Sequence, residues 1–329
     1  MLGKTVLVVG GAGYIGSHMV LALQSSGYTP VVVDNFSTGN RDIAKLLGVD
    51  LVECNAGDKT KLDPVFSRYN PIAVMHFAAF ALVGESVTDP GKYYQNNFCE
   101  TESLLQTMRK HGCKNFIFSS TCATYGVPKE VPISENCPQS PINPYGWSKL
   151  FVERMLSDYD RAYGIKSVAF RYFNAAGADP DSKIGERHDP ETHLIPNVIA
   201  AAYGKRSLSI FGNDYPTPDG TCVRDYIHVC DLASAHLLGL EYLLNGNQSD
   251  VFNIGTGNGL SVLEIIREVQ SVTQKEVKYS VESRRAGDPA MLVAAATKIR
   301  SVLGWTPKFS DIKTVVETAN RWHKKDFAR

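Results

Sequence analysis

The sequence predicts an α/β protein with a doubly wound parallel sheet and a smaller C-terminal lobe. Short β-branched runs alternate with helical patterns through the first half of the chain. A glycine-rich turn, GGAGYIG, follows the first of these runs. The second half loses the strict alternation and gains loops rich in Gly, Pro and Asp, as at 177–192 and 212–225. Such loops over the carboxyl ends of strands are where a substrate pocket forms.

The elements of the first half follow one another as strand and helix. The first strand is expected at 5–9 and leads into a helix at 14–26. The apolar character of the later strands indicates burial on both faces, which is typical of a parallel sheet covered by helices. Those strands are expected at 30–34, 51–53, 72–77, 115–120 and 167–172, and the helices near 59–68, near 98–111 and from Pro144 onward.

The turn after the first strand predicts a dinucleotide site. Gly10, Gly13 and Gly16 let the backbone approach a pyrophosphate at the N-terminus of the following helix. Asp34 ends the second strand eighteen residues after Gly16, where a carboxylate accepts hydrogen bonds from ribose hydroxyls and repels a 2′-phosphate. NAD is therefore favoured over NADP, although Arg41 lies nearby in sequence. We expect an NAD-binding Rossmann domain at 1–174, with a returning segment near 228–254, and a lobe mainly for substrate at 175–329.

Polar or small residues follow three later strands, at Gly57-Asp58, Ala78-Ala79 and Ser119-Ser120-Thr121. The carboxyl ends of parallel strands face the ligand in this topology. We therefore expect these positions to line the cofactor site.

Residues 143–150, NPYGWSKL, place Tyr145 and Lys149 four apart just after a proline. Proline suits the first turn of a helix, because the N–H that it lacks would have no partner there. The two side chains then lie on one helix face about one turn apart. A tyrosine titrates at about pH 10 in water, and a nearby ammonium and a positive nicotinamide ring both favour the phenolate. We therefore expect a lowered pKa for Tyr145, which would act as a general base.

The bulk composition excludes several classes of protein. Lys+Arg and Asp+Glu both number 34, so no basic surface for nucleic acid is expected. No apolar run reaches the roughly 18 residues of a membrane span. The N-terminus starts directly as a strand, without signal-peptide features. Seven scattered cysteines without C-x-x-C, and eight histidines without H-E-x-x-H, predict no disulfide framework and no metal site. The expected compartment is the cytoplasm.

These features resemble the extended branch of the short-chain dehydrogenase/reductase family and, over nearly the whole chain, the UDP-glucose 4-epimerases. The resemblance implies interconversion of UDP-glucose and UDP-galactose, a step of galactose metabolism, by reversible hydride transfer through a 4-keto sugar on bound NAD. Thr121, Tyr145 and Lys149 would be catalytic. The motifs that carry the resemblance are GGAGYIGSH, HFAAFALVGES, YYQNN, NFIFSSTCATYG, NPYGWSK, RYFNAAG, IFGNDYPTPDGTCVRDYIHV and RRAGDPA.

The resemblance and the strand-end positions also assign binding residues. Those expected to contact NAD are Gly10, Gly13, Tyr14, Ile15, Gly16, Asp34, Asn35, Asp58, Phe77, Ala78, Ala79, Asn96, Tyr145, Lys149 and Phe173. Those expected to contact the UDP-sugar are Thr121, Asn174, His193, Leu194, Ser209, Ile210, Phe211, Arg224, Arg285, Asp288 and Leu292.

Two arginines in polar loops, Arg224 and Arg285, suit a diphosphate because guanidinium groups stay charged and bind oxygens in pairs. From spacing alone, salt bridges with Asp225 and Asp288 are an equal alternative. By resemblance both arginines hold the UDP pyrophosphate, and Asp288 reaches the ribose.

By resemblance, residues 209–211 frame the uracil, whereas Asn174 and Leu194 contact the sugar nucleotide. His193 departs from the family, since many epimerases carry asparagine before the leucine. Leu292 stands where a tyrosine crowds out an N-acetyl group in some epimerases, so UDP-GlcNAc is a further expected substrate. Ala81 stands where some members place a lysine that contacts the nicotinamide ribose, which predicts looser NAD binding.

Two rival functions are considered on the same fold. The nearer is a sugar-nucleotide 4,6-dehydratase or decarboxylase. Dehydratases that resemble this chain carry an Asp-Glu pair after the strand-end threonine, whereas Cys122 and Ala123 stand there in this sequence, which argues against dehydration. A non-catalytic NAD sensor would be expected to lose Thr121, Tyr145 or Lys149, and all three are present.

A homodimer is expected mainly by resemblance, because related epimerases pair two helices of each subunit into a four-helix bundle. The apolar residues offered for this are Leu104, Leu105, Met108, Phe151, Met155 and Leu156.

Overall fold

The computed structural model describes residues 3–285 and 288–327. The chain divides into two compact units. The first comprises residues 1–126, 139–171 and 233–252, and the second comprises residues 127–138, 172–232 and 253–329. Residues 127–138, which lie within the range predicted for the first domain, thus belong to the second unit.

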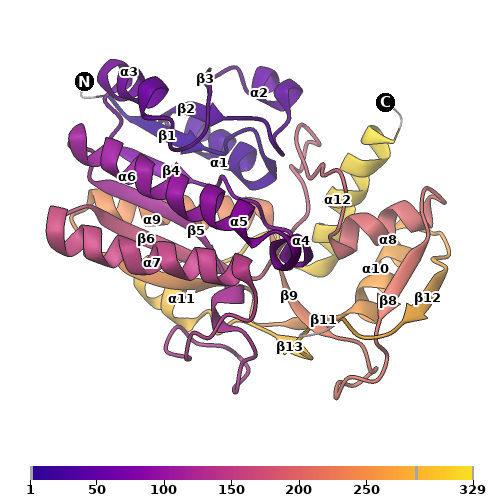
Figure 1. Cartoon of the computed structure of the whole chain (residues 1–329). Helices are drawn as coiled ribbons and strands as arrows, with labels where there is room; N and C mark the ends of the chain where they lie inside the picture. The colour runs from indigo at the N-terminus through magenta and orange to yellow at the C-terminus, as the bar shows by residue number, and fades with distance from the viewer. Residues whose placement is uncertain (1–2, 286–287, 328–329) are drawn as a thin grey trace. The chain divides into compact units, whose positions relative to one another are not determined.

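The first unit is built on a seven-stranded sheet of order β10-β6-β5-β4-β1-β2-β3 (Figure 1). The pairs β1–β2, β1–β4, β2–β3 and β4–β5 are parallel, which confirms the predicted doubly wound α/β fold. Strand order reverses between β1 and β4, and ligands bind at such a point beyond the carboxyl ends of the strands. The strands are β1 (Thr5–Val9), β2 (Thr29–Asp34), β3 (Asp50–Glu53), β4 (Ala73–His76), β5 (Asn115–Thr121), β6 (Lys166–Tyr172) and β10 (Asp250–Ile254).

Helices cover this sheet and connect its strands. They are α1 (Tyr14–Ser25), α2 (Arg41–Leu47), α3 (Lys59–Tyr69), α4 (Val83–Thr88), α5 (Pro90–Tyr93), α6 (Glu100–Lys110), α7 (Pro144–Tyr163) and α9 (Val229–Leu244). A π-helical segment, Tyr94–Cys99, joins α5 to α6, and a 3₁₀ turn, Cys122–Tyr125, follows β5.

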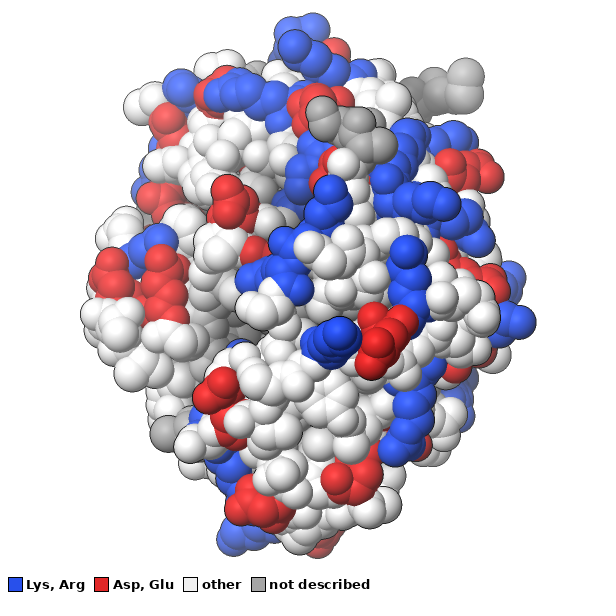
Figure 2. All heavy atoms as spheres, turned by 90° about the vertical axis from the view of Figure 1, so that its right-hand side faces the viewer, with Lys and Arg blue, Asp and Glu red and all other residues white. Residues whose placement is uncertain are grey.

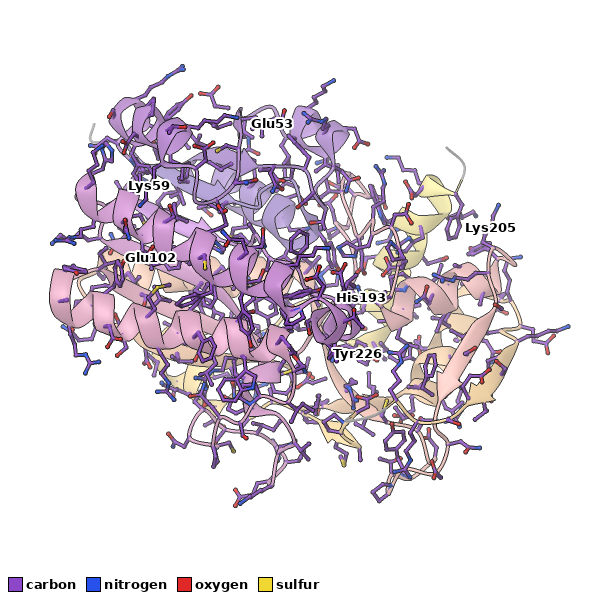
Figure 3. The ribbon with its side chains drawn as sticks, viewed as in Figure 1. Glu53, Lys59, Glu102, His193, Lys205 and Tyr226 are labelled. Carbon is purple, nitrogen blue, oxygen red and sulfur yellow. The ribbon has the colours of Figure 1, made fainter. Side chains whose placement is uncertain are left out.

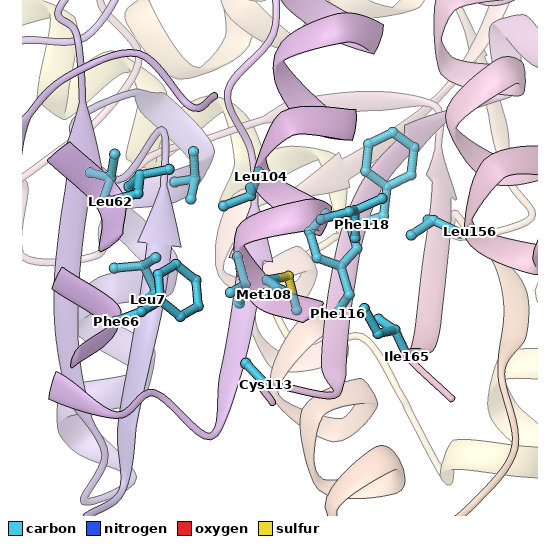
Figure 4. Close-up of a cluster of buried hydrophobic side chains, with 14 of the residues drawn as sticks. Leu7, Leu62, Phe66, Leu104, Met108, Cys113, Phe116, Phe118, Leu156 and Ile165 are labelled. Atoms are coloured by element: carbon cyan, nitrogen blue, oxygen red, sulfur yellow. The ribbon is translucent and has the colours of Figure 1, made fainter. Parts of the chain in front are cut away.

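The core of the first unit lies between the sheet and helices α3, α6 and α7 (Figure 4). Its largest side chains include Phe66, Phe116 and Phe118, none more than 2% exposed. Five of the six residues predicted from sequence to form a dimer interface are buried in this core. These are Leu104, Leu105, Met108, Met155 and Leu156. That part of the prediction is wrong, because these side chains already pack against the chain's own sheet; only Phe151 is exposed, at 41%.

The second unit contains two small sheets. In one, β9 (Val223–His228) pairs with β7 (Asn174–Ala176), β11 (Gly259–Ser261) and β13 (Met291–Leu292). In the other, β8 (Leu208–Phe211) pairs in parallel with β12 (Tyr279–Glu282). The helices of the unit are α8 (Leu194–Ala202), α10 (Val262–Thr273), α11 (Thr297–Leu303) and α12 (Ile312–Asp326).

The core of the second unit forms between helices α8, α10 and α12. Val198, Ile199, Ile265, Val269 and Val315 are fully buried there. Within the described residues, no helix combines the length and the apolar character needed to cross a membrane.

Candidate active site

The glycine turn of the first unit is shaped by close backbone contacts. Gly10 has a φ of +80°, and a Cβ there would lie 2.5 Å from the backbone nitrogen of Ala78. A Cβ on Gly16 would lie 2.1 Å from the carbonyl oxygen of Gly10. Only glycine fits either position, so the turn brings the start of α1 against the end of β4. Gly13 caps α1 without a side-chain hydrogen bond, which leaves the first N–H groups of the helix available to an anion.

Asp34, at the end of β2, supports this turn. Its carboxylate accepts hydrogen bonds from the backbone N–H of Ala12 at 2.9 Å and of Phe36 at 2.8 Å. Burial raises the pKa of Asp34, although these two hydrogen bonds oppose the rise. Each carboxylate oxygen has a second lone pair, so the group can still accept a ribose hydroxyl. Arg41 pairs with Glu53 instead, at 2.6 Å between Nη1 and Oε2.

Other residues assigned to the cofactor take part in local structure as well. Asp58 caps α3 by accepting from the backbone N–H groups of Thr60 and Lys61. Asn35 donates to Asn55 at 2.9 Å, and the ring of Phe77 lies 5.0 Å from that of His236. The structure places the assigned residues in the first unit with one exception, since Phe173 belongs to the second.

The residues predicted to be catalytic meet at the end of β5. Asn143 caps α7 by accepting from the Gly146 N–H at 2.8 Å, and Pro144 takes the first helical position. Tyr145 then lies in the first turn, and its phenol is hydrogen bonded to the side chain of Thr121. Thr121 also accepts from the backbone N–H of Ala123 at 3.1 Å, which orients its hydroxyl.

Lys149 lies one turn further along α7 and is 2% exposed. Its ammonium donates to the carbonyl oxygen of Ser119 at 2.8 Å and lies 4.9 Å from the centre of the Phe118 ring. The lysine is thus held between helix and sheet with its charge at the strand end.

The electrostatics of this pair differ from the prediction. Burial raises the pKa of Tyr145 to about 12, although the hydrogen bond to Thr121 opposes the rise. Burial also lowers the pKa of Lys149 to about 7, against the favourable charge of Glu153. In the chain without NAD, burial thus raises the pKa of Tyr145 instead of lowering it. The lowering expected from Lys149 together with a positive nicotinamide ring stays a prediction.

A buried ion pair beneath this site was missed by the sequence analysis. Glu153, a further turn along α7, accepts from Arg171 on β6 at 3.0 Å from Nε and 2.5 Å from Nη2. Arg171 also donates to the hydroxyl of Tyr125 at 2.8 Å, and Ser120 donates to Glu153 at 2.5 Å. The spacing of Lys149 and Glu153 on one helix face was an available signal, but it does not identify Arg171 as the partner.

In the second unit, Arg224 on β9 forms an ion pair with Asp288. The neighbouring Asp225 does not take part in such a pair. It accepts three backbone N–H groups from two segments, those of Thr256 (2.9 Å) and Gly257 (3.0 Å) in one and that of Ala294 (3.1 Å) in the other. Arg224 thus pairs with Asp288 and not with its neighbour Asp225, whereas Asp225 organises the backbone around β9. The choice between a salt-bridge role and a diphosphate role stays a prediction.

A pocket of about 520 Å³ lies beside this pair. The guanidinium of Arg285 stands 3.9 Å from the centre of the Phe211 ring, and β13 pairs Leu292 with Arg224 in register. Ser209 contacts Ser280 at 3.0 Å, while Ile210 is buried in the core. The residues that line the pocket are Val127, Tyr215, Pro216, Arg284, Arg285, Asp288, Pro289 and Ala290.

A smaller pocket, of about 40 Å³, brings together three residues assigned to the sugar nucleotide: Asn174, His193 and Leu194. Asn174 donates to the carbonyl oxygen of Asp225 at 3.2 Å. His193 lies at the start of α8 and Tyr226 on β9, as labelled in Figure 3. Figure 2 shows Lys and Arg side chains interspersed with Asp and Glu on the face drawn there.

Comparisons with known proteins agree with this geometry. The family model described as "NAD dependent epimerase/dehydratase family" matches residues 6–255. A UDP-glucose 4-epimerase from Rhizobium leguminosarum bv. trifolii is 50% identical over 326 residues, which is 99% of each chain.

Two solved structures are similar over the whole chain. A UDP-glucose 4-epimerase from Brucella ovis in complex with NAD has a TM-score of 0.94 at 50% identity, covering 96% of this chain and 97% of that one. The UDP-Glc/GlcNAc 4-epimerase from Campylobacter jejuni has a TM-score of 0.86 at 42% identity, covering 98% and 100%. With its glycine turn and its paired Thr121 and Tyr145, this chain belongs to the NAD-dependent epimerase/dehydratase family.

Proposed function

We propose that the chain is a UDP-glucose 4-epimerase that interconverts UDP-glucose and UDP-galactose on bound NAD. The observation that carries the proposal is the hydrogen bond between Thr121 and Tyr145 at the end of β5, with Lys149 buried one turn away. These three residues suit proton transfer to and from a sugar hydroxyl. Relatives that cover nearly the whole chain carry the same activity in their names.

The first unit fits NAD. A Cβ at Gly10 or Gly16 would meet backbone atoms of the chain itself, so the turn is as tight as one that lets a pyrophosphate approach the backbone. The start of α1 offers N–H groups to its oxygens, and Asp34 offers a carboxylate to a ribose. The chemistry that NAD supplies when bound is reversible acceptance of a hydride from carbon 4 of the sugar.

The chain's own residues would handle the proton. Tyr145 takes the proton from the 4-hydroxyl, and Thr121 holds the same oxygen through its hydroxyl. The pKa of about 12 makes the free phenol a weak base, so a positive charge brought by the cofactor is needed to favour the phenolate. Lys149 adds to that charge when it is protonated. A positioned general base contributes about 10²–10⁴-fold to the rate.

The second unit would bind the UDP-sugar. We propose that Arg224 and Arg285 hold the diphosphate, since guanidinium groups bind phosphate oxygens in pairs. Arg224 is held on β9 by its pair with Asp288, whose second oxygen remains for a ribose. The pocket of about 520 Å³ beside them is large enough for part of a nucleotide. Asn174, His193 and Leu194 would contact the sugar nucleotide at the smaller pocket.

We also propose a homodimer, on a smaller patch than the sequence analysis expects. Four aromatic side chains, those of Tyr94, Phe98, Trp147 and Phe151, cluster on α7 and the neighbouring π-helical segment, with ring centres 5.5–6.2 Å from that of Phe151. Trp147 is 36% exposed and Phe151 is 41% exposed. An exposed aromatic cluster of this kind is typical of protein interfaces. Light scattering at micromolar concentrations should give the mass of two chains, and a monomer throughout would contradict the proposal.

A cytoplasmic location fits the cysteines. The seven thiols are free, and three of them, Cys54, Cys113 and Cys122, are buried. Unpaired cysteines in this number are usual in a reducing compartment.

The function is tested by incubating the purified full-length chain with UDP-galactose without added NAD or metal. We expect UDP-glucose to form until the two sugars reach equilibrium, and NAD to be released when the protein is denatured. If added NAD stimulates the reaction, the loose binding predicted from Ala81 is supported. Absence of epimerisation at saturating NAD would overturn the proposal, and release of a 4-keto-6-deoxy sugar would point to a dehydratase instead.

A further inference from the structure

A cluster of two glutamates and two histidines lies in the loop that leads into α8. The four residues are Glu186, His188, Glu191 and His193, and they form the pattern E-x-H-x-x-E-x-H. Each offers one ligand atom, and all four atoms lie within 4.8 Å of one another. Carboxylate oxygens and imidazole nitrogens are common ligands of zinc and related divalent metals.

The nitrogen–oxygen separations in the cluster scatter around those of a tetrahedral site. Nδ1 of His193 lies 2.6 Å from Oε1 of Glu186 and 3.3 Å from Oε1 of Glu191. Nδ1 of His188 lies 3.1 Å from Oε1 of Glu186 and 3.8 Å from Oε2 of Glu191. Ligand atoms bound to a tetrahedral zinc stand roughly 3.3–3.6 Å apart, given bonds of about 2.0–2.2 Å. Of the four observed nitrogen–oxygen separations, 3.3 Å falls in this range, 2.6 and 3.1 Å lie below it and 3.8 Å lies above it.

The cluster is supported by the surrounding chain. Glu186 is 3% exposed, and its carbonyl oxygen accepts from Nε1 of Trp322 on α12 at 2.7 Å. Glu191 accepts from the backbone N–H groups of Thr192 and His193 at 2.8 and 2.9 Å. Metal ligands are usually oriented by such secondary hydrogen bonds.

The charge balance also favours a cation. A buried carboxylate needs a positive partner, and here two carboxylates face two imidazoles. The two imidazole rings lie 5.4 Å apart, and one divalent ion between them would balance both carboxylates at once.

We propose that Glu186, His188, Glu191 and His193 bind one divalent transition-metal ion, zinc in the first place, which fixes the loop before α8. The site lies in the second unit and takes no part in the proton chemistry proposed for Tyr145. Its ligand His193 also lines the smaller pocket proposed for the sugar nucleotide, but zinc binding is measured without substrate and does not require the proposed activity. The pattern E-x-H-x-x-E-x-H contains neither H-E-x-x-H nor C-x-x-C, so the sequence motifs for metal sites do not predict it.

The test is zinc binding by the full-length chain after treatment with EDTA and desalting. Isothermal titration with zinc chloride should give one site per chain, and Co²⁺ should give the visible absorption of a tetrahedral complex. The melting temperature should rise with zinc concentration, since an ion that binds only the folded chain stabilises it.

Variants assign the site. His188→Ala should weaken zinc binding by more than the roughly 10–100-fold that loss of a supporting residue costs. His188→Cys should restore it, because a thiolate is a zinc ligand. Glu191→Gln keeps the shape and the accepted N–H bonds but removes a charge, so it should also weaken binding. His111→Ala is the matched control, since His111 pairs with a carboxylate, that of Asp63 at 3.0 Å, outside the cluster.

Two results would overturn the proposal. One is the absence of saturable zinc binding by the EDTA-treated wild type. The other is a wild-type zinc affinity and cobalt spectrum in folded His188→Ala and Glu191→Gln. The cluster would then be an ion pair of carboxylates with protonated histidines.

Discussion

Both units bury a glutamate against a cationic partner, but the partners differ in kind. In the first unit, Glu153 on α7 binds Arg171 on β6, and both side chains are no more than 6% exposed. In the second, Glu186 lies in a loop against His188 and His193. A guanidinium stays charged at any pH at which the protein is folded, whereas an imidazole loses its proton near neutrality.

The two buried glutamates anchor different kinds of segment. Glu153 follows Tyr145 and Lys149 on the same helix, so its permanent ion pair ties the helix of the proposed catalytic residues to the sheet. Glu186 precedes a helix start assigned to sugar-nucleotide binding, and its charge balance depends on pH or on a bound metal. The helix of the proposed catalytic residues is thus anchored by a permanent ion pair, whereas the loop before α8 is held by titratable partners.

The largest effect is expected from removing the phenol oxygen that the rigid helix positions. Tyr145→Phe should lower kcat by about 10²–10⁴-fold, because the proton loses its acceptor, while UDP binding in the second unit stays unchanged. Steady-state kinetics and titration with UDP measure both quantities. Tyr159→Phe is the control, since Tyr159 lies on the same helix and bonds to Glu102 at 3.0 Å. Turnover near that of the wild type would remove Tyr145 from the mechanism.

The second prediction tests the permanent ion pair. Glu153→Ala should lower the free energy of unfolding by about 3–5 kcal/mol, because it leaves Arg171 charged and buried without its partner. Urea unfolding monitored by circular dichroism measures the change. Glu53→Ala breaks an Arg–Glu pair that is more than half exposed and should change stability little. An equal decrease in the free energy of unfolding in the two variants would show that burial does not determine how much these ion pairs stabilise the protein.

The third prediction tests the titratable partner in metal-free protein. Burial opposes the charge on His193, but the carboxylates of Glu186 and Glu191 outweigh burial and raise the pKa of His193 to about 10. The pKa of Glu186 is lowered to about 2, because His193 and His188 outweigh the effect of its burial. A raised histidine pKa gives stability that is full below about pH 6.5 and is lost as the pH rises through about 10. The lowered pKa of Glu186 changes the stability only below about pH 4.5, where the stability falls with falling pH.

Thermal melts should therefore show stability falling as the pH rises from about 6.5 toward 10. His193→Asn should flatten this part of the curve, and so should saturating zinc, which needs the neutral imidazole. The other titratable groups around the pair are His188 and Glu191 in the loop and His323 on α12, whose pKa is lowered by burial. A slope that is the same in wild type and His193→Asn would locate the titration elsewhere.

The smallest effect concerns selectivity in the second unit. Leu292 pairs in register with Arg224, and a leucine leaves more room than a tyrosine for an N-acetyl group. We expect measurable epimerisation of UDP-GlcNAc, slower than that of UDP-glucose. Leu292→Tyr should abolish it while leaving UDP-galactose conversion intact, and Leu292→Met is the size-matched control. If the wild type forms no UDP-GalNAc while UDP-galactose equilibrates fully, the size of residue 292 does not set selectivity.

Much of the first unit was predictable from sequence because its signals are local. The glycine turn, Asp34 at a strand end and Pro144 at a helix start each depend on a few adjacent residues, and the predicted sheet is confirmed. The roles of the assigned site residues remain predictions. The pKa of Tyr145 was not predictable, because burial by distant segments sets it.

The remaining misses have the same origin. The ion pair of Glu153 and Arg171 joins a helix to a strand, so no spacing along the chain reveals it. The apolar residues of α6 and α7 could face either the sheet or a second subunit, and only the packed structure shows that Leu104 and Leu156 face the sheet. The cluster at 186–193 is contiguous in sequence, but two histidines and two glutamates in an unfamiliar order give no signal until the loop is folded.

The segments of the two units alternate along the chain, and this constrains how the protein can fold while it is being synthesised. The first unit takes its last segment from residues 233–252, after the whole stretch 172–232 that belongs to the second. Until that segment emerges, β6 is an open edge without β10, and Phe170 lacks its contact with the ring of His236, whose centre lies 4.7 Å from its own. Neither unit can be completed by vectorial synthesis before the other has begun, so a nascent chain halted near residue 171 presents an unpaired strand.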